Sequence, residues 1–227
     1  MQKEKTNPEL GQRVHKHLVS LGIETPITEL VNVPSKEKIA KIEEFQRQSL
    51  LTLGLDLTDD SLIETPKRIA KMYVEELFYG LDYNNFPKCT EVDNKIEYDE
   101  MVIERCSVKS VCEHHLVYFG TAHRPDLSCW VSYMPGEKVL GLSKLSRIVD
   151  FFSRRPQIQE RLTVQIAETI KFITGTEDVA VVMKGQHFCV LTRGVEDSDG
   201  VTITSSLSGS FRTDPTLRSE MMSLIKG

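Results

Sequence analysis

The chain has 227 residues, of which 40% are hydrophobic and 27% are charged, and its formal net charge is −5 at pH 7. A chain of this length and composition can bury a full hydrophobic core, so we expect one large domain, or one domain with an appendage. The acidic balance argues against general binding to nucleic acid or to an anionic membrane, because both need a dense basic surface.

No stretch predicts export or membrane insertion. The sequence lacks a run of about 18 apolar residues that could span a bilayer, and its opening, Met-Gln-Lys-Glu-Lys-Thr, has no apolar signal-peptide core. The five cysteines are an odd number and too widely spaced for a small secreted disulfide scaffold. We therefore expect a cytoplasmic protein whose cysteines bind metal, react or fill the core.

Residues 1–95 predict a helical region. Val14 and Leu18 recur at helical spacing, which indicates a short helix packed on another element. A longer helix is expected from Ser35 to about Gly54, because a capping hydroxyl precedes an apolar stripe and a glycine follows it. We expect that stripe to pack in the core. It consists of Ile39, Ile42, Phe45 and Leu53.

A third helix is expected to begin at Thr65, where a capping hydroxyl precedes a proline at the first helical position. Arg68 and Lys71 lie on this helix. By themselves they are best interpreted as part of a solvated basic face, because no neighbouring motif indicates an anion.

Residues 96–227 predict a different architecture. Stretches rich in Val, Ile, Tyr, Phe and Trp begin near Met101 and indicate strands between turns. Two amphipathic helices are expected, over 141–152 and from Pro156 to Gly175, and strands then return. Strands, two helices and strands again predict an α+β domain whose two helices cover one face of an antiparallel sheet.

The stretch Cys112-Glu-His-His115 places a thiol and two imidazoles within four residues, and Zn²⁺ prefers such ligands. His187 and Cys189, two residues apart, would place another imidazole and thiol on one face of an expected strand. Cys112 and His115 point to opposite faces of any regular strand. Joint ligation therefore requires a turn or bulge, and we expect irregular backbone at Glu113.

The starts of the two central helices carry polar groups. Ser143, Lys144 and Arg147 lie near the first start, where exposed N–H groups favour an anion and the two cations would complete its neutralisation. A solvated cationic face explains these three equally well. Gln159 and Glu160 lie at the second start, where the helix dipole by itself favours a carboxylate.

Together these residues carry a resemblance to GTP cyclohydrolase I that extends from about residue 36 to 211. The resemblance implies the tunnelling fold, an antiparallel sheet with two helices per subunit. It also implies a homodecamer of two face-to-face pentamers, with active sites at subunit interfaces. The motifs that resemble the family are Glu64-Thr-Pro-x-Arg68-Ile-Ala-Lys71, Cys112-Glu-His-His115, Gly141-Leu-Ser-Lys144 through Arg147, Arg155-Pro-Gln-Ile-Gln-Glu-Arg161 and His187-x-Cys189-x-x-x-Arg193.

By this resemblance, Cys112, His115 and Cys189 bind Zn²⁺ and leave a fourth position for water, the open pattern of a catalytic site. His114 and His187 would move protons at the purine and the ribose. Further roles are implied for substrate binding: guanine at Glu160, ribose or base at Gln159, and triphosphate at Ser143, Lys144, Arg147 and Arg193, with Arg68 and Lys71 as additional ligands.

The implied reaction hydrolyses GTP, releases formate and closes the rearranged sugar into 7,8-dihydroneopterin triphosphate. The product would feed folate, another pterin or a deazaguanine nucleoside. One segment departs from the family pattern: about six additional residues between His115 and Tyr133 predict a longer hairpin, whose tip Pro125 and Asp126 suit as turn residues. His123, in that segment, has no counterpart role.

Two other classes of protein stay open. One is a non-catalytic module in which His114 or His187 closes a structural zinc site. The other is a related tunnelling-fold enzyme acting on a different purine or pterin. The motif from Ser143 to Arg147 argues against both, because a structural site has no use for a phosphate motif and a substrate without triphosphate would leave its cations uncompensated.

Overall fold

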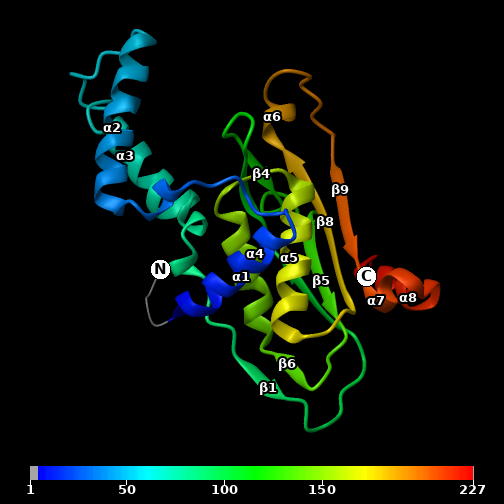
Figure 1. The fold of residues 1–227 in the computed structure, drawn as a ribbon. Helices are drawn as coiled ribbons and strands as arrows, with labels where there is room; N and C mark the ends of the chain where they lie inside the picture. The colour runs from blue at the N-terminus through cyan, green and yellow to red at the C-terminus, as the bar shows by residue number, and fades with distance from the viewer. Residues whose placement is uncertain (1–4, 227) are drawn as a thin grey trace.

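The computed structural model describes residues 5–226 and shows one antiparallel sheet with helices on both faces, from which a helical arm projects (Figure 1). The sheet strands are β2 (Val102–Cys106), β3 (Lys109–Cys112), β4 (Tyr118–Gly120), β5 (Ser128–Tyr133), β8 (Val179–His187), β9 (Thr202–Leu207) and the short β7 (Pro156–Gln157). A separate two-stranded ribbon pairs β1 (Glu91–Asp93) with β6 (Lys138–Leu140).

The central strand β8 organises the sheet. β5 and β9 both pair with its residues 180–184 and therefore lie along opposite edges of it. β4 pairs with the last residues of β8, and β3 pairs with β4. All of these pairs are antiparallel, and only β7 joins in parallel, at the outer edge of β3.

The additional residues loop out of a strand and do not lengthen the hairpin. From Gly120 to Ser128 the chain advances eight positions, while its partner strand advances two, from Gln186 to Lys184. The difference is six residues. Residues 121–127, here called the insert loop, hold this surplus between β4 and β5. The expected longer hairpin after the cysteine–histidine motif is therefore wrong, because regular pairing on both sides of the loop keeps the strand register.

Two helices cover one face of the sheet, as the α+β prediction requires: α4 (Leu142–Ser153) and α5 (Gln159–Thr174). Both bury an apolar stripe against odd-numbered β8 residues such as Val181 and Met183. α5 begins three residues later than expected, because Pro156 belongs to β7. The predicted fold class is confirmed.

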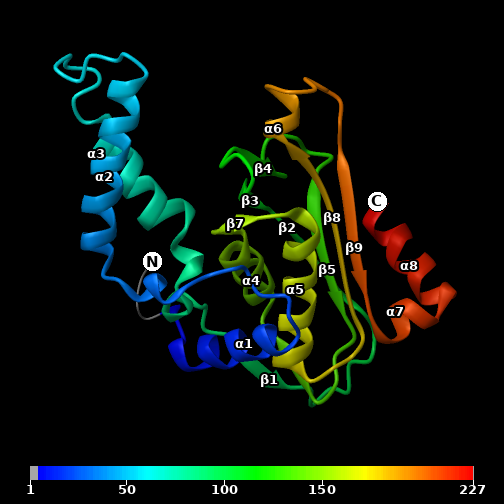
Figure 2. The same ribbon diagram turned by 45° about the horizontal axis from the view of Figure 1, so that its top comes forward.

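The opposite face carries two helices that the sequence analysis did not predict, α7 (Gly209–Thr213) and α8 (Pro215–Lys226). Ala180 and Val182 of β8 pack here with Phe211 and Met221, because alternate strand residues point to opposite faces. Figure 2 shows this pair on the far side of β9 from α4 and α5.

The first helix, α1 (Pro8–Ser20), packs against α5, and Val14 and Leu18 are fully buried in the main core. The expected helix is therefore confirmed. Its histidines are half-buried: His15 stacks on Tyr83 and His17 on Phe172. The division of the chain at residue 95 stays a prediction. α1 precedes that boundary and shares its hydrophobic core with the sheet that follows it.

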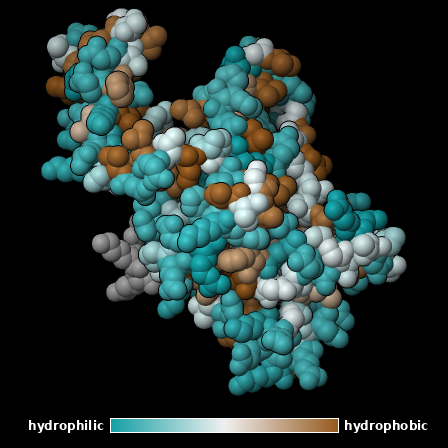
Figure 3. Space-filling view, in the orientation of Figure 1, coloured by the Kyte–Doolittle hydropathy of each residue, from teal (hydrophilic) through white to brown (hydrophobic). Residues whose placement is uncertain are grey.

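The arm consists of α2 (Ser35–Thr52) and α3 (Thr65–Lys71), which continues as the π-helical turn η3 (Met72–Leu77). It stands away from the sheet (Figures 1 and 2). No residue of α2 is buried, Phe45 is 68% exposed and Leu53 is 77% exposed. The prediction that this stripe packs in a core is wrong for the single chain, and Figure 3 shows hydrophobic surface on the arm.

Short 3-10 turns complete the chain trace: η2 (Glu29–Asn32), η4 (Tyr79–Leu81) and η5 (Tyr83–Asn85). Among the described residues, no helix combines the length and apolarity needed to cross a membrane.

Candidate metal centre

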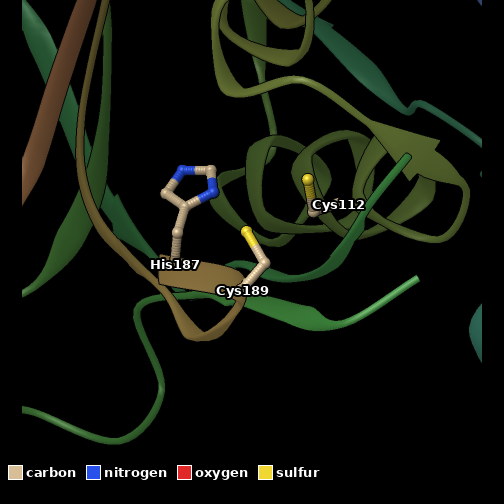
Figure 4. A group of neighbouring side chains, drawn as sticks. All are labelled: Cys112, His187 and Cys189. Atoms are coloured by element: carbon tan, nitrogen blue, oxygen red, sulfur yellow. The ribbon is translucent and has the colours of Figure 1, made fainter. Parts of the chain in front are cut away.

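Two thiols and an imidazole meet at one end of the sheet (Figure 4). Cys112 is the last residue of β3, His187 is the last residue of β8, and Cys189 lies in the one-turn helix α6 (Phe188–Leu191). One ligand atom from each side chain lies within 4.8 Å of the other two. Two sulfur donors and one nitrogen donor are a set that suits Zn²⁺.

Cys189 reaches this group from a helical turn and not from a strand. The prediction that His187 and Cys189 share one strand face is wrong, because β8 ends at His187 and the chain turns into α6. The Thr192 hydroxyl donates to the Phe188 carbonyl oxygen at 2.7 Å and closes this turn. The helical turn brings the His187 and Cys189 side chains together. We had expected a strand to do so by placing alternate residues on one face.

The predicted irregularity at Glu113 is confirmed: residues 113–115 form a turn, and Leu116 has a φ of 52°. Left-handed backbone is unfavourable for a residue other than glycine and persists only where its surroundings hold it. Here the Glu113 carboxylate pairs with Arg161, and its backbone N–H donates to the Gln157 carbonyl oxygen at 3.0 Å.

The turn directs its two histidines to different partners. His114 Nδ1 lies 3.7 Å from Cys112 Sγ, whereas His115 Nε2 lies 3.3 Å from Arg193 Nη1. His115 is exposed and lies outside the group of three that includes His187. The resemblance-based assignment of His115 as a zinc ligand therefore stays a prediction.

Hydrogen bonding determines which nitrogen of His187 carries its proton. The Gln159 side chain is 1% exposed, and its Nε2 donates to Thr202 O at 3.0 Å and to Thr204 Oγ1 at 3.1 Å. Gln159 Oε1 must therefore accept from His187 Nε2–H, 3.0 Å away. This leaves Nδ1 unprotonated, and a ring nitrogen faces the thiols in Figure 4.

Burial keeps this imidazole neutral. It lowers the pKa of His187, and the nearby Glu160 carboxylate opposes the shift. The His187 ring also stacks on Phe119 with centroids 4.5 Å apart, a contact that the sequence analysis missed. Pairing of β4 with β8 places Phe119 opposite His187, so only the strand register could have predicted it.

The two thiols are close enough to affect each other. Burial, followed by the neighbouring Cys112 thiol, raises the pKa of Cys189. Bound zinc has the opposite effect on a thiol, because a cation stabilises the thiolate. Without a metal, two neighbouring thiols therefore disfavour each other's ionisation. With a bound cation, both can ionise and coordinate it, so their closeness favours a metal centre.

Two charged residues of the predicted substrate site lie near this centre. Glu160 is exposed in the first turn of α5, beside His187. Arg193 is exposed beside His115. Gln159, in contrast, is engaged within the chain, and its predicted contact with ribose or base stays a prediction.

The remaining predicted triphosphate residues lie elsewhere in the chain. Ser143, Lys144 and Arg147 are at the start of α4, which follows β6. Figure 1 shows β6 at one end of the molecule and α6 at the other. Arg68 and Lys71 are exposed on the arm. A single chain does not bring these cations to the metal centre.

Comparison with known proteins agrees with this geometry. The family model described as GTP cyclohydrolase I matches residues 42–226. The protein named GTP cyclohydrolase 1 from Aeromonas salmonicida is 51% identical over 216 residues, which cover 94% of this chain and 95% of that protein. A protein of the same name from Shewanella denitrificans is 49% identical over 215 residues, covering 94% and 96%.

A solved structure, the apo form of the archaeosine synthase QueF-Like, is 20% identical and covers 48% of this chain and 93% of its own, with a TM-score of 0.38. The family model and the curated relatives extend over the sheet, the central helices and the cysteine–histidine motifs. The chain is thus an enzyme that belongs to the GTP cyclohydrolase I family.

Proposed function

We propose that the chain hydrolyses GTP, releases formate and forms 7,8-dihydroneopterin triphosphate. The observation that carries this proposal is the Cys112, His187 and Cys189 group beside Glu160, in a chain of this family. It unites donors for a metal with a carboxylate that can select a purine. We also propose that the protein is cytoplasmic, which suits its five unpaired cysteines.

The donor set fits zinc, and we propose that Cys112, His115 and Cys189 hold it. When bound, zinc supplies the Lewis acidity that makes water a nucleophile near neutral pH. His115 follows Cys112 by three residues on an exposed turn. His187 is tied to the buried Gln159, so its Nδ1 is the better candidate for proton transfer.

The competing assignment makes His187 the third ligand, and zinc content separates the two. His115→Ala should lose zinc, whereas His187→Ala should retain it and lose turnover. Elemental analysis of both purified variants checks this expectation. Zinc retained in His115→Ala but lost from His187→Ala would reverse the assignment.

Glu160 provides a means to select guanine. Guanine presents N1–H and its exocyclic 2-amino group side by side, and one carboxylate can accept from both. Adenine has an unprotonated ring nitrogen at that position and no amino group beside it. An exposed carboxylate in the first turn of α5 can meet the base edge while the reacting ring lies at the metal centre.

Two imidazoles are placed to move protons. His187 Nδ1 has a free lone pair and can accept a proton, while Nε2–H remains on Gln159 Oε1. His114 Nδ1 lies 3.7 Å from Cys112 Sγ. Two imidazoles on different elements can serve different atoms of one substrate.

The position of Ser143, Lys144 and Arg147 favours a site shared between subunits. α4 has 12 residues and is about 18 Å long. Figure 1 shows α6, the helix of Cys189, at the opposite end of the molecule from β6, the strand before α4. We propose that these residues, with Arg68 and Lys71, bind triphosphate for a neighbouring copy, whereas Arg193 acts in its own chain. The exposed apolar stripe of the arm supports assembly, and the proposed state is a homodecamer.

The reaction is tested by incubating zinc-loaded protein with GTP while formate and pterin absorbance are followed together. GTP should give both products in equal amounts, and ATP should give neither. A closed structural zinc site would yield no formate. A related enzyme acting on another purine would leave GTP unchanged.

Subunit mixing tests the shared site. We expect Cys189→Ser and the double variant Lys144→Ala/Arg147→Ala each to be impaired. After the two are dissociated and reassembled together in equal amounts, about a quarter of the sites should regain both sets of residues if assembly is random. Activity no higher than the average of the two parents would contradict sites shared between subunits.

A further inference from the structure

We propose that the insert loop positions the metal-binding end of β8 and that His123 is the residue through which it acts. This inference rests on the proposed function, because it concerns the same metal centre. It assigns a role to the insert loop, residues 121–127, which holds the six surplus residues, and it makes His123 a positioning residue that touches no reacting atom.

The first link is a hydrogen-bond chain that runs through the buried Gln186 side chain. His123 Nε2 lies 2.8 Å from Gln186 Oε1, and Gln186 Nε2 donates to the Ser198 carbonyl oxygen at 2.8 Å. The Gln186 side chain is 2% exposed. Because its amide nitrogen is engaged by Ser198, its oxygen needs a donor, and His123 Nε2–H is that donor.

The second link is aromatic. The His123 ring meets the Phe188 ring edge-on, with centroids 5.0 Å apart, and meets Tyr118 at 6.0 Å. Tyr118 and Phe188 also contact each other at 5.3 Å. Phe188 lies between His187 and Cys189 in the chain, so these three rings hold the backbone that presents two members of the metal group.

The loop itself is anchored on both sides, which lets it hold His123 in place. Asp126 lies 3.1 Å from the ammonium group of Lys184 in β8. On the other side, the guanidinium group of Arg105 in β2 donates to the Pro125 carbonyl oxygen and to the Ser128 hydroxyl. The loop therefore connects two strands while it contacts α6.

Two consequences follow for the site. Through Phe188, His123 restrains the turn that carries Cys189. Through Gln186 and Ser198, it restrains the segment between α6 and β9, which also carries Arg193. Groups that orient ligands from outside the coordination sphere commonly change metal affinity or activity by about 10–100-fold when they are removed. Loss of His123 should therefore weaken both zinc binding and GTP binding.

The test compares three variants of the full chain with the wild type. His123→Ala removes donor and ring, His123→Gln keeps an N–H donor of similar reach, and Arg124→Ala is the matched control. Arg124 is the next residue in the loop, and its side chain pairs with Asp126. Zinc affinity is measured by competition with a chelator, and GTP kinetics and thermal unfolding are measured on the same preparations.

We expect His123→Ala to weaken zinc binding about 10-fold or more and to raise KM for GTP more than it lowers kcat. His123→Gln should recover most of the zinc affinity, and Arg124→Ala should match the wild type. Wild-type zinc affinity and KM in His123→Ala, or an equal loss in Arg124→Ala, would overturn the inference.

Two further measurements keep the outcome decisive. Should His123→Ala fail to fold, His123→Phe keeps a ring against Phe188 but lacks the donor, and it should still bind zinc less tightly than His123→Gln. Equal zinc affinities in these two would refute the hydrogen-bond link. A wild-type protein that binds zinc but forms no formate from GTP would refute the proposed function, while the zinc affinities would still test the role of His123.

Discussion

The two ends of the helix layer differ in how much of their chemistry one chain completes. At the metal end, Cys112 is 5% exposed and Cys189 is 7% exposed, and Gln159 holds His187 in one tautomer. At the start of α4, Ser143 is exposed, and Lys144 and Arg147 are only half-buried. The metal end is thus preorganised within the fold, whereas the α4 end is open at the surface.

This difference has a physical reason. Metal ligation and proton transfer require particular atoms in a narrow range of geometry, so their residues must be held by buried neighbours. A triphosphate is recognised mainly by charge and by donors on long side chains, and these can come from the surface of another copy. The four predictions below test whether the two ends behave so differently.

The largest effect is expected at the thiols. Cys189→Ser and Cys112→Ser should each lose zinc and with it most of the catalysis, because enzymes accelerate reactions by about 10⁶-fold or more and the metal is central to this site. Elemental analysis and formate release measure the two losses. Full zinc occupancy in either variant would show that the thiol is not a ligand.

Glu160 should produce the next largest effect. Glu160→Gln keeps the shape and one acceptor but replaces the second acceptor with a donor, and a site built on such pairing can discriminate by about 10⁴-fold. We expect a large fall in kcat/KM for GTP with zinc retained. The alternative is a helix-end role worth about 0.3–1 kcal/mol. Lower thermal stability with unchanged kcat/KM would favour that alternative.

His114 should separate proton transfer from metal binding. His114→Ala should retain zinc and lose about 10²–10⁴-fold in turnover, the usual contribution of a proton-transfer group. Single-turnover kinetics with GTP, together with zinc content, provide the measurement. A rate equal to that of the wild type would remove His114 from the mechanism.

Arg147 should produce the smallest effect, and only on substrate binding. Arg147→Ala removes a cation whose hydrogen bonds to phosphate contribute about 1.5–3 kcal/mol, so KM for GTP should rise by about 10–100-fold with zinc content unchanged. Loss of zinc in this variant would mean that the two ends are not independent. An unchanged KM would return Arg147 to a solvated face.

Local sequence patterns predicted where helices form better than they predicted what packs against those helices. Apolar periodicity correctly indicated helices beginning at Ser35 and Thr65, because it acts within a few residues. The predicted caps are wrong, because both hydroxyl residues lie inside their helices and neither side chain makes a capping hydrogen bond. The same periodicity gave no information on what covers the stripe. Phe45 was expected in a core, yet it is exposed on the arm, because an apolar helix face can be buried by its own chain or by another one.

The metal site shows the same division. Residue types at Cys112 and Cys189 indicated a zinc site, because soft donors are uncommon and their chemistry is specific. That Cys189 lies in a helical turn, that His187 points at the thiols and that His115 faces Arg193 depended on the backbone path after β3 and β8. Spacing along the chain does not define that path.

By itself, the sequence determined the α+β class, the two central helices and the two thiols of the metal group, because these depend on local periodicity and on side-chain chemistry. Only the tertiary structure decided the position of the insert loop, the proton on His187 Nε2 and the distance of the α4 start from the metal centre. These features depend on strand register and on contacts between residues far apart in the chain, such as His187 with Gln159 and Gln186 with His123. Such contacts leave no periodic signal, because each is made by a single pair of side chains that only the folded sheet brings together.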